Sequence, residues 1–433
     1  MNKQILRLAL PSIVSNIVVP LLGIMDLTIA GHLGATAFIG AVAVGAMMFN
    51  FTYWNFGFLR MGTSGMTAQA FGNGDMREAA NVLLRSVLLA VAIGVVIVAF
   101  QYPLRWLLLW AISPEADVYG LASSYFAVCV WGAPALLATL GMSGWFVGMQ
   151  NSVYPMAVSI AVNVVNIIVS LVCVFPFGMG FIGIAVGTLV AQWCGFILSA
   201  VLVLRVMRQS GIKSVRAGRK LLAGLGRFFR INSDIFLRSL CLMLVTLFFT
   251  SAGARSGNLT LAVNALVMQM FVLFSYFIDG FAFAGEALVG RYAGAGDAAK
   301  LRECVIRLFA WGCVVMAAFS VAYGACGDLV MRLLTDDAAV VAEAARYRWW
   351  AVAIPVAGMA AFVWDGIYIG LTATRRMLAS LAVASAVFFA TYYGLALFDT
   401  CLAPNTRLWT AFILYLATRG IVQTALYRKI RLS

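Results

Sequence analysis

Charged side chains are scarce in this chain of 433 residues: Asp, Glu, Lys and Arg make up 11% of it, against 63% hydrophobic residues. Soluble domains carry about 25% charged residues, so a globular protein of this composition could not cover its surface with polar groups. Apolar runs of about 20 residues, long enough to span ~30 Å of hydrocarbon, recur along the whole chain. The sequence therefore predicts an all-α integral membrane protein.

Metal-ligand and disulfide patterns are also missing. The chain has one histidine, His32, and its eight cysteines are scattered without a CxxC pair. These features argue against a multi-histidine metal site and against a disulfide framework. We therefore expect no metal and no cofactor, and a membrane-embedded enzyme is disfavoured because no loop is long enough for a soluble domain.

Basic residues outnumber acidic ones, which gives a formal net charge of +14. They gather in particular inter-helix segments, above all 205–232, as the positive-inside rule requires. We therefore expect a membrane protein without a nucleic-acid partner. If 205–232 is cytoplasmic, the even number of spans on each side of it places both termini in the cytoplasm.

Apolar runs bounded by Gly, Pro, Asn and charge predict twelve transmembrane helices in two bundles of six. The expected spans are residues 7–31, 40–70, 80–103, 117–147, 154–175, 183–206, 232–254, 262–290, 302–324, 341–370, 379–398 and 407–427.

The chain also repeats itself at a constant offset. "FGNGDMREAANVLLRS" resembles "AGAGDAAKLRECVIRL" with Asp75 aligned to Asp297, and "GWFVGMQNS" from Gly144 resembles "GIYIGLTAT" from Gly366. Both pairs are 222 residues apart. Because six helices is an even number, both halves enter from the same side and form a parallel repeat about a pseudo-two-fold axis.

The repeat defines the expected domains. We expect an N-lobe at 1–206, a basic cytoplasmic linker at 207–230 and a C-lobe at 231–433. Asp75 and Asp297 each follow a Gly-x-Gly turn, so we expect both to be helix N-caps.

The first predicted helix contains a carboxylate, Asp26, in the otherwise apolar run "PLLGIMDLTIAGHLG". An ionised Asp in hydrocarbon costs roughly 2.5–3.5 kcal/mol on insertion scales. It could snorkel to the outer interface, but the polar flank begins only at His32, which favours a functional group. In the fifth helix Asn163 and Asn166 share a face, where they could join helices or supply oxygens for a proton or Na⁺.

A second set of polar residues lies in the predicted helices of the second half. Asp279 and Glu286 are seven residues apart and share a face, and Asp365 precedes a glycine-rich bend. Arg238 follows Asp234 by four residues, which favours a local ion pair. The remaining residues could form structural ion pairs, a second cation-binding region or part of a substrate cavity.

Together these features resemble the multidrug and toxic compound extrusion (MATE) family, and within it the DinF-like branch. The motifs are "LALPSIVSNIVVPLLGIMDLTIAGHLG", "LRMGTSGMTAQAFGNGD", "DGFAFAGEALVGRYAGAGD" and "WDGIYIGLTAT", and the likeness covers essentially the whole chain. The resemblance implies two six-helix lobes with rocker-switch alternating access. It also implies a monomer in a bacterial inner membrane that exports small organic, often cationic, compounds against an inward H⁺ or Na⁺ gradient.

The resemblance also assigns roles within the N-lobe. Asp26 matches the family's aspartate of the first helix and Pro11 its proline, while Asn166 and Thr188 match polar residues of the fifth and sixth helices. Ser170 stands where relatives in this branch often carry a second aspartate. We therefore expect Asp26 to be the one carboxylate whose loading by H⁺ or Na⁺ switches the access state.

The alternative function is a flippase for lipid-linked sugars or other amphipathic lipids, which shares this architecture. Such a protein should line its cavity with cations for a pyrophosphate headgroup. The arginines in or near the predicted helices are Arg60, Arg85, Arg238, Arg291 and Arg419.

Overall fold

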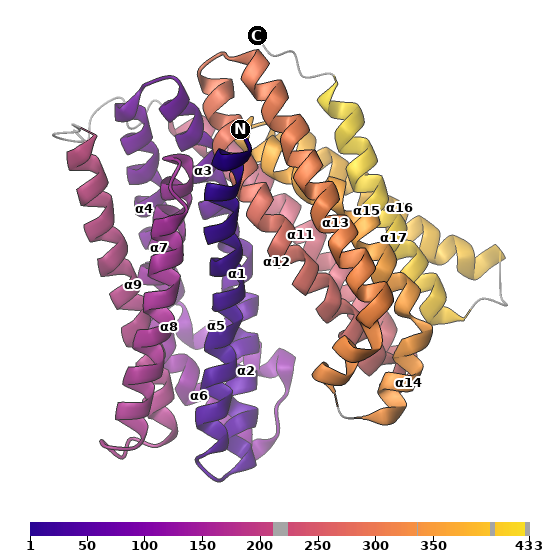
Figure 1. Cartoon of the computed structure of the whole chain (residues 1–433). Coiled ribbons are helices and arrows are strands. Elements are labelled where there is room, and N and C mark those ends of the chain that lie inside the picture. Colours follow the sequence, from indigo (N-terminus) through magenta and orange to yellow (C-terminus); the bar gives the residue numbers. More distant parts are fainter. Residues whose placement is uncertain (211–223, 336, 399–402, 429–433) are drawn as a thin grey trace. The chain divides into compact units, whose positions relative to one another are not determined.

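The computed structural model describes residues 1–210, 224–335, 337–398 and 403–428. All regular elements within these ranges are helical (Figure 1). The chain divides into two compact units, which we call the N-terminal unit (Leu10–Asn232) and the C-terminal unit (Met1–Ala9 with Ser233–Ser433). Most of the expected linker 207–230 lies outside the described residues.

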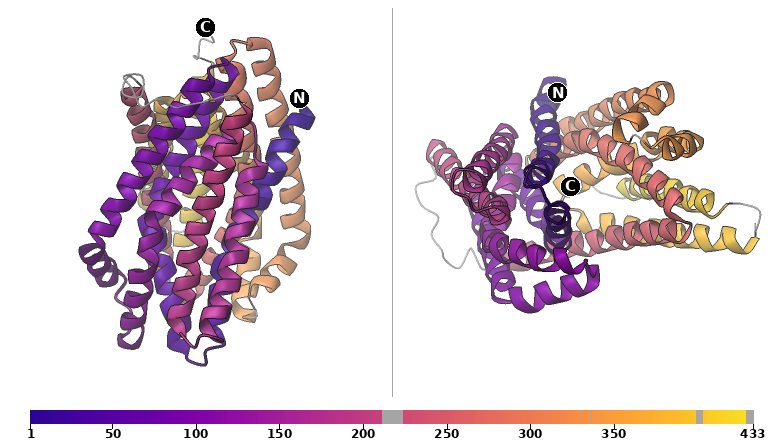
Figure 2. Two further views of the ribbon diagram at one scale, coloured as in Figure 1. Left: turned by 90° about the vertical axis from the view of Figure 1, so that its left-hand side faces the viewer. Right: turned by 90° about the horizontal axis from the view of Figure 1, so that it is seen from below.

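The N-terminal unit is a bundle of long helices that run lengthwise beside one another (Figure 2). Its α-helices are α1 (Asn2–Gly31), α2 (Thr36–Tyr53), α3 (Phe58–Gly72), α4 (Met76–Ala99), α5 (Gln101–Ile112), α6 (Ala116–Cys129), α7 (Ala133–Gly148), α8 (Val153–Val174) and α9 (Phe181–Gln209). The 3₁₀ turns η1 (Trp54–Gly57) and η2 (Val130–Gly132) join α2 to α3 and α6 to α7. Two of the expected spans in this unit, 40–70 and 117–147, therefore each consist of two helical segments.

Apart from Met1–Ala9, the C-terminal unit starts within the long helix α11. Its helices are α11 (Leu225–Arg255), α12 (Asn258–Gly294), α13 (Ala298–Leu334), α14 (Ala338–Arg346), α15 (Arg348–Gly370), α16 (Thr374–Phe398) and α17 (Pro404–Tyr427).

The twelve expected spans correspond to helices in this structure, which confirms the fold class. Eleven of the helical segments in the described ranges are long and apolar enough to cross a membrane. The remaining expected span is α17, whose apolar run is interrupted by Arg419 and Gln423. Both of these side chains are buried, so α17 presents its polar groups to the protein interior.

The two halves of the chain contain the same turn at positions 222 residues apart. Gly74 and Gly296 have φ angles of 74° and 67°, a conformation that glycine adopts without strain. The backbone N–H groups of Asp75 and Asp297 then bond the carbonyl five residues earlier, at 2.9 and 3.0 Å. Their carboxylates accept from the N–H three residues later, at 2.9 and 3.0 Å, so both predicted N-caps are confirmed.

A close helix crossing is repeated as well. A Cβ atom on Gly144 of α7 would lie 2.1 Å from the carbonyl oxygen of Arg60 in α3. A Cβ atom on Gly366 of α15 would lie 2.1 Å from the carbonyl oxygen of Ala282 in α12. Small residues let membrane helices approach this closely, so the second repeated motif is a packing motif.

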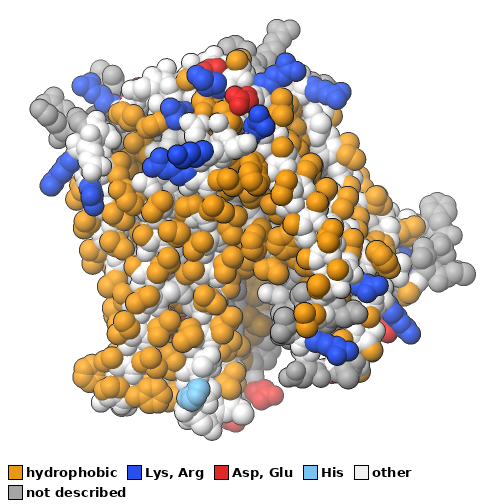
Figure 3. All heavy atoms as spheres, in the orientation of Figure 1, with side chains coloured by type: hydrophobic (Ala, Val, Ile, Leu, Met, Phe, Trp, Pro, Cys, Tyr) orange, Lys and Arg blue, Asp and Glu red, His pale blue; other side chains and the backbone are white. Residues whose placement is uncertain are grey.

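The outer surface of the N-terminal unit is mainly apolar. Figure 3 shows hydrophobic side chains along the length of this unit, on the left of the picture, with Lys and Arg gathered at its upper end and the histidine at its lower end. Large apolar side chains are exposed on α1, α8 and α9: Val19, Ile24, Val164, Ile168, Ile197 and Val201. This surface suits contact with lipid.

Candidate functional site

Asp26 points into the N-terminal unit. The residue is 2% exposed, whereas Ile24, two positions earlier on α1, is 56% exposed. The two side chains therefore lie on opposite sides of one helix. This burial does not fit a carboxylate that snorkels to the membrane interface.

Three neighbouring side chains form a hydrogen-bonded chain with Asp26. Tyr125 Oη and Thr188 Oγ1 donate to Asp26 Oδ2 at 3.4 and 3.3 Å, and Asn166 Nδ2 donates to Thr188 Oγ1 at 3.0 Å. The two contacts to the carboxylate are long for hydroxyl donors, which prefer about 2.7–2.8 Å. The structure thus brings Asp26, Asn166 and Thr188 together, and their role in coupling stays a prediction.

Thr188 can direct its hydroxyl hydrogen to either of two acceptors. Its Oγ1 lies 3.2 Å from the carbonyl oxygen of Ile184 as well as 3.3 Å from Asp26 Oδ2. A hydroxyl has one hydrogen to donate, so bonding to Asp26 and bonding to Ile184 are alternatives. An ionised Asp26 favours the first arrangement. A protonated Asp26 can donate to Thr188, which then turns its hydrogen to Ile184.

Glycines on α9 bring Thr188 close to α8. A Cβ atom on Gly187 would lie 2.0 Å from Ser170 Oγ, and one on Gly183 would lie 2.8 Å from the backbone nitrogen of Val174. Gly183 and Gly187 form a GxxxG pair, a pattern that lets helices approach closely in membranes. Thr188 follows directly, which places its hydroxyl within reach of Asn166.

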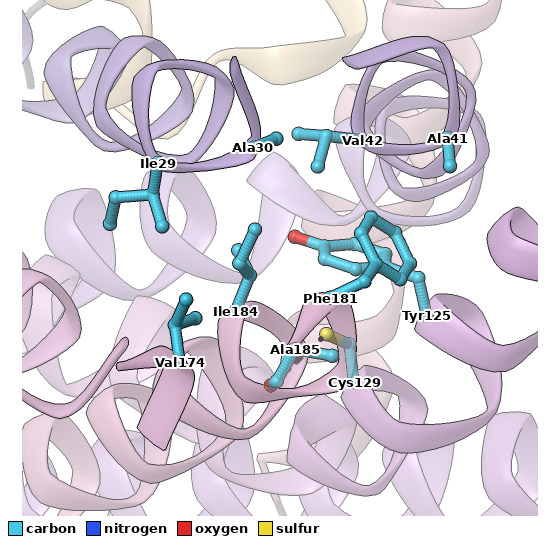
Figure 4. Packing of buried hydrophobic residues seen from close by; sticks show 10 residues of the cluster. All are labelled: Ile29, Ala30, Ala41, Val42, Tyr125, Cys129, Val174, Phe181, Ile184 and Ala185. Carbon is cyan, nitrogen blue, oxygen red and sulfur yellow. Dashed lines mark hydrogen bonds between the residues drawn. The ribbon is translucent and has the colours of Figure 1, made fainter. Parts of the chain in front are cut away.

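Tyr125 is a member of the group that the sequence did not single out. A Cβ atom on Gly45 of α2 would lie 2.5 Å from Tyr125 Cδ1, so this glycine makes room for the ring. Phe49 and Phe181 flank the ring with centroids 6.1 and 6.0 Å away. Figure 4 shows the tyrosine packed among Phe181 and other buried side chains of α1, α2, α6 and α9. The sequence did contain a signal for this residue, namely a tyrosine within an apolar span. A buried Tyr hydroxyl usually has a hydrogen-bond partner.

The other predicted members of the N-terminal site lie apart from this chain of bonds. Asn163 Nδ2 donates to the carbonyl of Ser159 at 3.0 Å, within its own helix. Pro11 precedes Asp26 by 15 residues on α1, which corresponds to roughly 22 Å of helix, so the structure does not bring the two together. Among the described residues, several buried oxygens of this region have no hydrogen-bond partner: Asp26 Oδ1, Asn163 Oδ1, Asn166 Oδ1 and Ser170 Oγ.

A second buried polar group lies in the C-terminal unit. Asp365 of α15 binds Arg238 of α11 and Arg419 of α17 through Oδ2. Its Oδ1 accepts from Gln423 Nε2 of α17 at 2.7 Å. All four residues are buried, so three helices are joined by one carboxylate.

The predicted local pair between Asp234 and Arg238 is wrong. Arg238 bonds Asp365, and Asp234 Oδ2 accepts from Thr374 Oγ1 at 2.8 Å. An ion pair between residues four apart on a helix surface is worth only about 0.3–0.5 kcal/mol. A charge-assisted bond to a buried carboxylate is stronger, which explains the preference of Arg238 for α15.

Glu286 and Asp279 lie on α12 with different degrees of burial. Glu286 is buried where α12 meets α15: its carbonyl oxygen is 3.0 Å from the Cβ position of Gly370. Asp279 is half-buried, and its charge acts on Arg419.

Arg85 also has a carboxylate partner. Its Nη1 donates to Glu78 Oε1 at 2.6 Å. Three of the five arginines that a flippase would need, Arg85, Arg238 and Arg419, are thus bound to carboxylates of the protein itself.

Known proteins resemble this chain along nearly all of its length. The MatE family model matches residues 11–172 and 235–393. The chain is 34% identical to DNA damage-inducible protein F of Escherichia coli, over 99% of this chain and 92% of that protein. It is 26% identical to the probable multidrug resistance protein NorM of Thermotoga maritima, over 78% of this chain and 74% of that protein. The crystal structure of the Vibrio cholerae MATE transporter VcmN in the bent form has the same fold, with a TM-score of 0.85 at 17% identity, over 99% of this chain and 96% of that one.

Proposed function

Because this chain belongs to the MatE family of multidrug efflux transporters, we propose that it is a cation-coupled antiporter. It exports small organic, often cationic, compounds across a bacterial inner membrane as a monomer, by rocker-switch alternating access. An inward H⁺ or Na⁺ gradient drives export, and the ion is loaded on Asp26.

The contrast between two buried aspartates carries this proposal. In the described part of the chain, Asp26 accepts hydrogen bonds from neutral hydroxyl groups and has no cationic partner. Asp365 is held by two guanidinium groups. A buried ionised carboxylate without a cation is costly, so Asp26 gains most from taking up H⁺ or Na⁺, whereas Asp365 is already neutralised.

The surroundings of Asp26 support both coupling ions. A proton needs only the carboxylate, and its arrival allows the Thr188 hydroxyl to turn from Asp26 to Ile184. Na⁺ would need further oxygens, and the unpaired Asn166 Oδ1 and Ser170 Oγ are nearby candidates on α8. Ser170 supplies no second negative charge, which favours the proton.

The test is export by the Asp26→Asn variant in vesicles with an imposed pH or Na⁺ gradient. Asn has the size and hydrogen-bonding reach of Asp but cannot cycle a charge, so we expect coupled export to stop while substrate binding and folding persist. Asp117→Asn, the same change at an exposed position on α6, is the matched control and should export normally.

Normal export by Asp26→Asn, with unchanged ion dependence and matched expression, would show that Asp26 is not the coupling site. Glu286 would then be the next candidate, because Asp365 is already held by two guanidinium groups. Cation-dependent efflux of organic compounds by the wild-type chain would also separate the antiporter from the flippase.

A further inference from the structure

We propose that the C-terminal unit contains a binding site for a singly charged oxyanion attached to an aromatic or apolar body. The site is the arginine cluster, which we define as Arg238, Asp365, Tyr415, Arg419 and Gln423. The inference does not depend on ion loading at Asp26, because all five residues belong to α11, α15 and α17.

The arginine cluster has more positive than negative charge in direct contact. Arg238 and Arg419 both donate to one oxygen of Asp365, and the other oxygen accepts from the neutral amide of Gln423. Two guanidinium groups therefore share one carboxylate. Asp279 on α12 acts on Arg419 through its charge, but the hydrogen-bond donors of the cluster still outnumber its acceptors.

Unused donors mark where an anion would bind. In the described part of the chain, Nε of Arg238, Nε of Arg419 and Oη of Tyr415 are buried and have no hydrogen-bond partner, while Gln423 Oε1 is a buried acceptor without a donor. Buried polar groups nearly always have a partner, so three unpaired donors within one cluster are unusual. Carboxylates and similar oxyanions accept from guanidinium groups in a fork geometry, and a phenol hydroxyl can donate to the same anion.

The aromatic rings around the arginine cluster indicate the chemistry of the part of the ligand that carries the anionic group. The Arg419 guanidinium lies 5.6 Å from the ring centroid of Phe362, and Phe412 stacks on Tyr415 with centroids 6.0 Å apart. Phe271 contacts both Phe362 and Phe412, at 6.0 and 5.5 Å. Phe362 and Phe271 are only half-buried, so the aromatic surface continues outward from the charged group.

The charge of the arginine cluster and the aromatic rings beside it together indicate the chemical class of the ligand. Two guanidinium groups share one carboxylate in direct contact, so a single negative charge, as on a carboxylate, a sulfonate or a phosphodiester, would complete the pairing, and a diphosphate would exceed it. Such a group could come from an organic acid or from the headgroup of an anionic lipid.

The experiment measures binding of benzoate to the purified full chain in nanodiscs of zwitterionic lipid, by calorimetry, with benzamide as the neutral comparison. We expect wild type to bind benzoate and to bind benzamide at least tenfold more weakly. Arg419→Gln should weaken benzoate binding at least tenfold, because it leaves a neutral pair of Arg238 and Asp365. Tyr415→Phe, which keeps the ring, should weaken it several-fold, and Asp117→Asn should leave it unchanged.

A second set of nanodiscs containing phosphatidylglycerol distinguishes the two sources of the anion. If the lipid is the natural ligand, phosphatidylglycerol will suppress benzoate binding and will be retained by wild type but not by Arg419→Gln. If an organic acid is the ligand, the lipid will have no effect. The proposal is wrong if wild type, Arg419→Gln and Tyr415→Phe show equal binding of benzoate and equal retention of lipid.

Testing Asp26→Asn in the same assay separates this inference from the proposed coupling. That variant should lose coupled export and keep wild-type benzoate binding.

Discussion

Asp26 and Asp365 are both buried carboxylates, and their neighbours decide what each can do. Hydroxyl groups of Tyr125 and Thr188 leave the charge of Asp26 free to be cancelled by a mobile ion. Two guanidinium groups tie Asp365 to α11 and α17. The first arrangement suits an exchangeable ion, and the second suits a fixed junction between helices.

The fixed role of Asp365 predicts a large effect on stability. Asp365→Asn should lower the free energy of unfolding by about 3–5 kcal/mol, because two buried guanidinium groups lose the carboxylate charge that they share. Thermal unfolding of the purified protein in detergent measures this. Asp234→Asn is the matched control, since the amide oxygen of Asn can still accept from Thr374 Oγ1; equal losses for the two variants would contradict the prediction.

At the residue scale, the sequence predicted the Asp26, Asn166 and Thr188 group through a family resemblance, and the structure places these side chains together. Tyr125 was missed because it lies 99 residues from Asp26 along the chain, and no spacing rule connects positions on separate helices. The same limit explains the error at Arg238, whose partner Asp365 is 127 residues away.

At the scale of single elements, the approach of α9 to α8 depends on small residues. Gly187→Ala should destabilise the protein by about 1–3 kcal/mol, the usual cost of overpacking, because the new Cβ would meet Ser170. It should also slow export by moving Thr188 away from Asn166. Unfolding and efflux assays measure the two effects.

Gly120→Ala on α6 is the control for that substitution. A Cβ atom there meets nothing within 4 Å, and Ala is the better helix former by about 1 kcal/mol. The control should therefore be neutral or stabilising. A Gly187→Ala variant as stable as the Gly120→Ala variant would show that α8 and α9 can separate without cost.

The cap of α13 predicts a pH effect. Hydrogen bonds from Lys300 hold the pKa of Asp297 below its usual value. A carboxylate with a lowered pKa stabilises the folded state above its unfolded pKa, near 3.9, and loses this contribution as the pH falls through the folded value. The stability advantage of wild type over Asp297→Asn, which keeps a capping side chain, should therefore be present at pH 6 and vanish in strong acid. An advantage that persists unchanged at pH 2 would exclude the charge as its source.

Helix positions were largely predictable, because long apolar runs and Gly-x-Gly-Asp turns mark where membrane helices run and begin. The breaks inside the expected spans could not be predicted from the sequence. η1 and η2 lie within runs as apolar as the helices around them, so hydropathy cannot locate them. α5 was missed for a related reason: its twelve residues, Gln101–Ile112, are too few to register as a span.

At the scale of the whole molecule, the distribution of basic residues predicts orientation. We expect Ser210, at the end of α9, to face the cytoplasm. A Ser210→Cys variant in a cysteine-free background should react with an impermeant thiol reagent only after the inner face is opened, whereas Glu115→Cys should react in intact cells. The opposite labelling pattern would overturn the topology.

Helices α1 and α11 are each divided between the two units. Residues 1–9 of the chain group with the C-terminal unit, where Gln4 bonds Tyr292 at 3.0 Å, and α11 up to Asn232 groups with the N-terminal unit, where Arg227 bonds Gln69 at 2.8 Å. The two points of division, after residues 9 and 232, are 223 residues apart, within one residue of the repeat offset.

This is the pattern of a reciprocal exchange, in which each half gives the start of its first helix to the other. A chain divided between Gln209 and Gly224 would therefore leave each piece holding the segment that groups with the other unit.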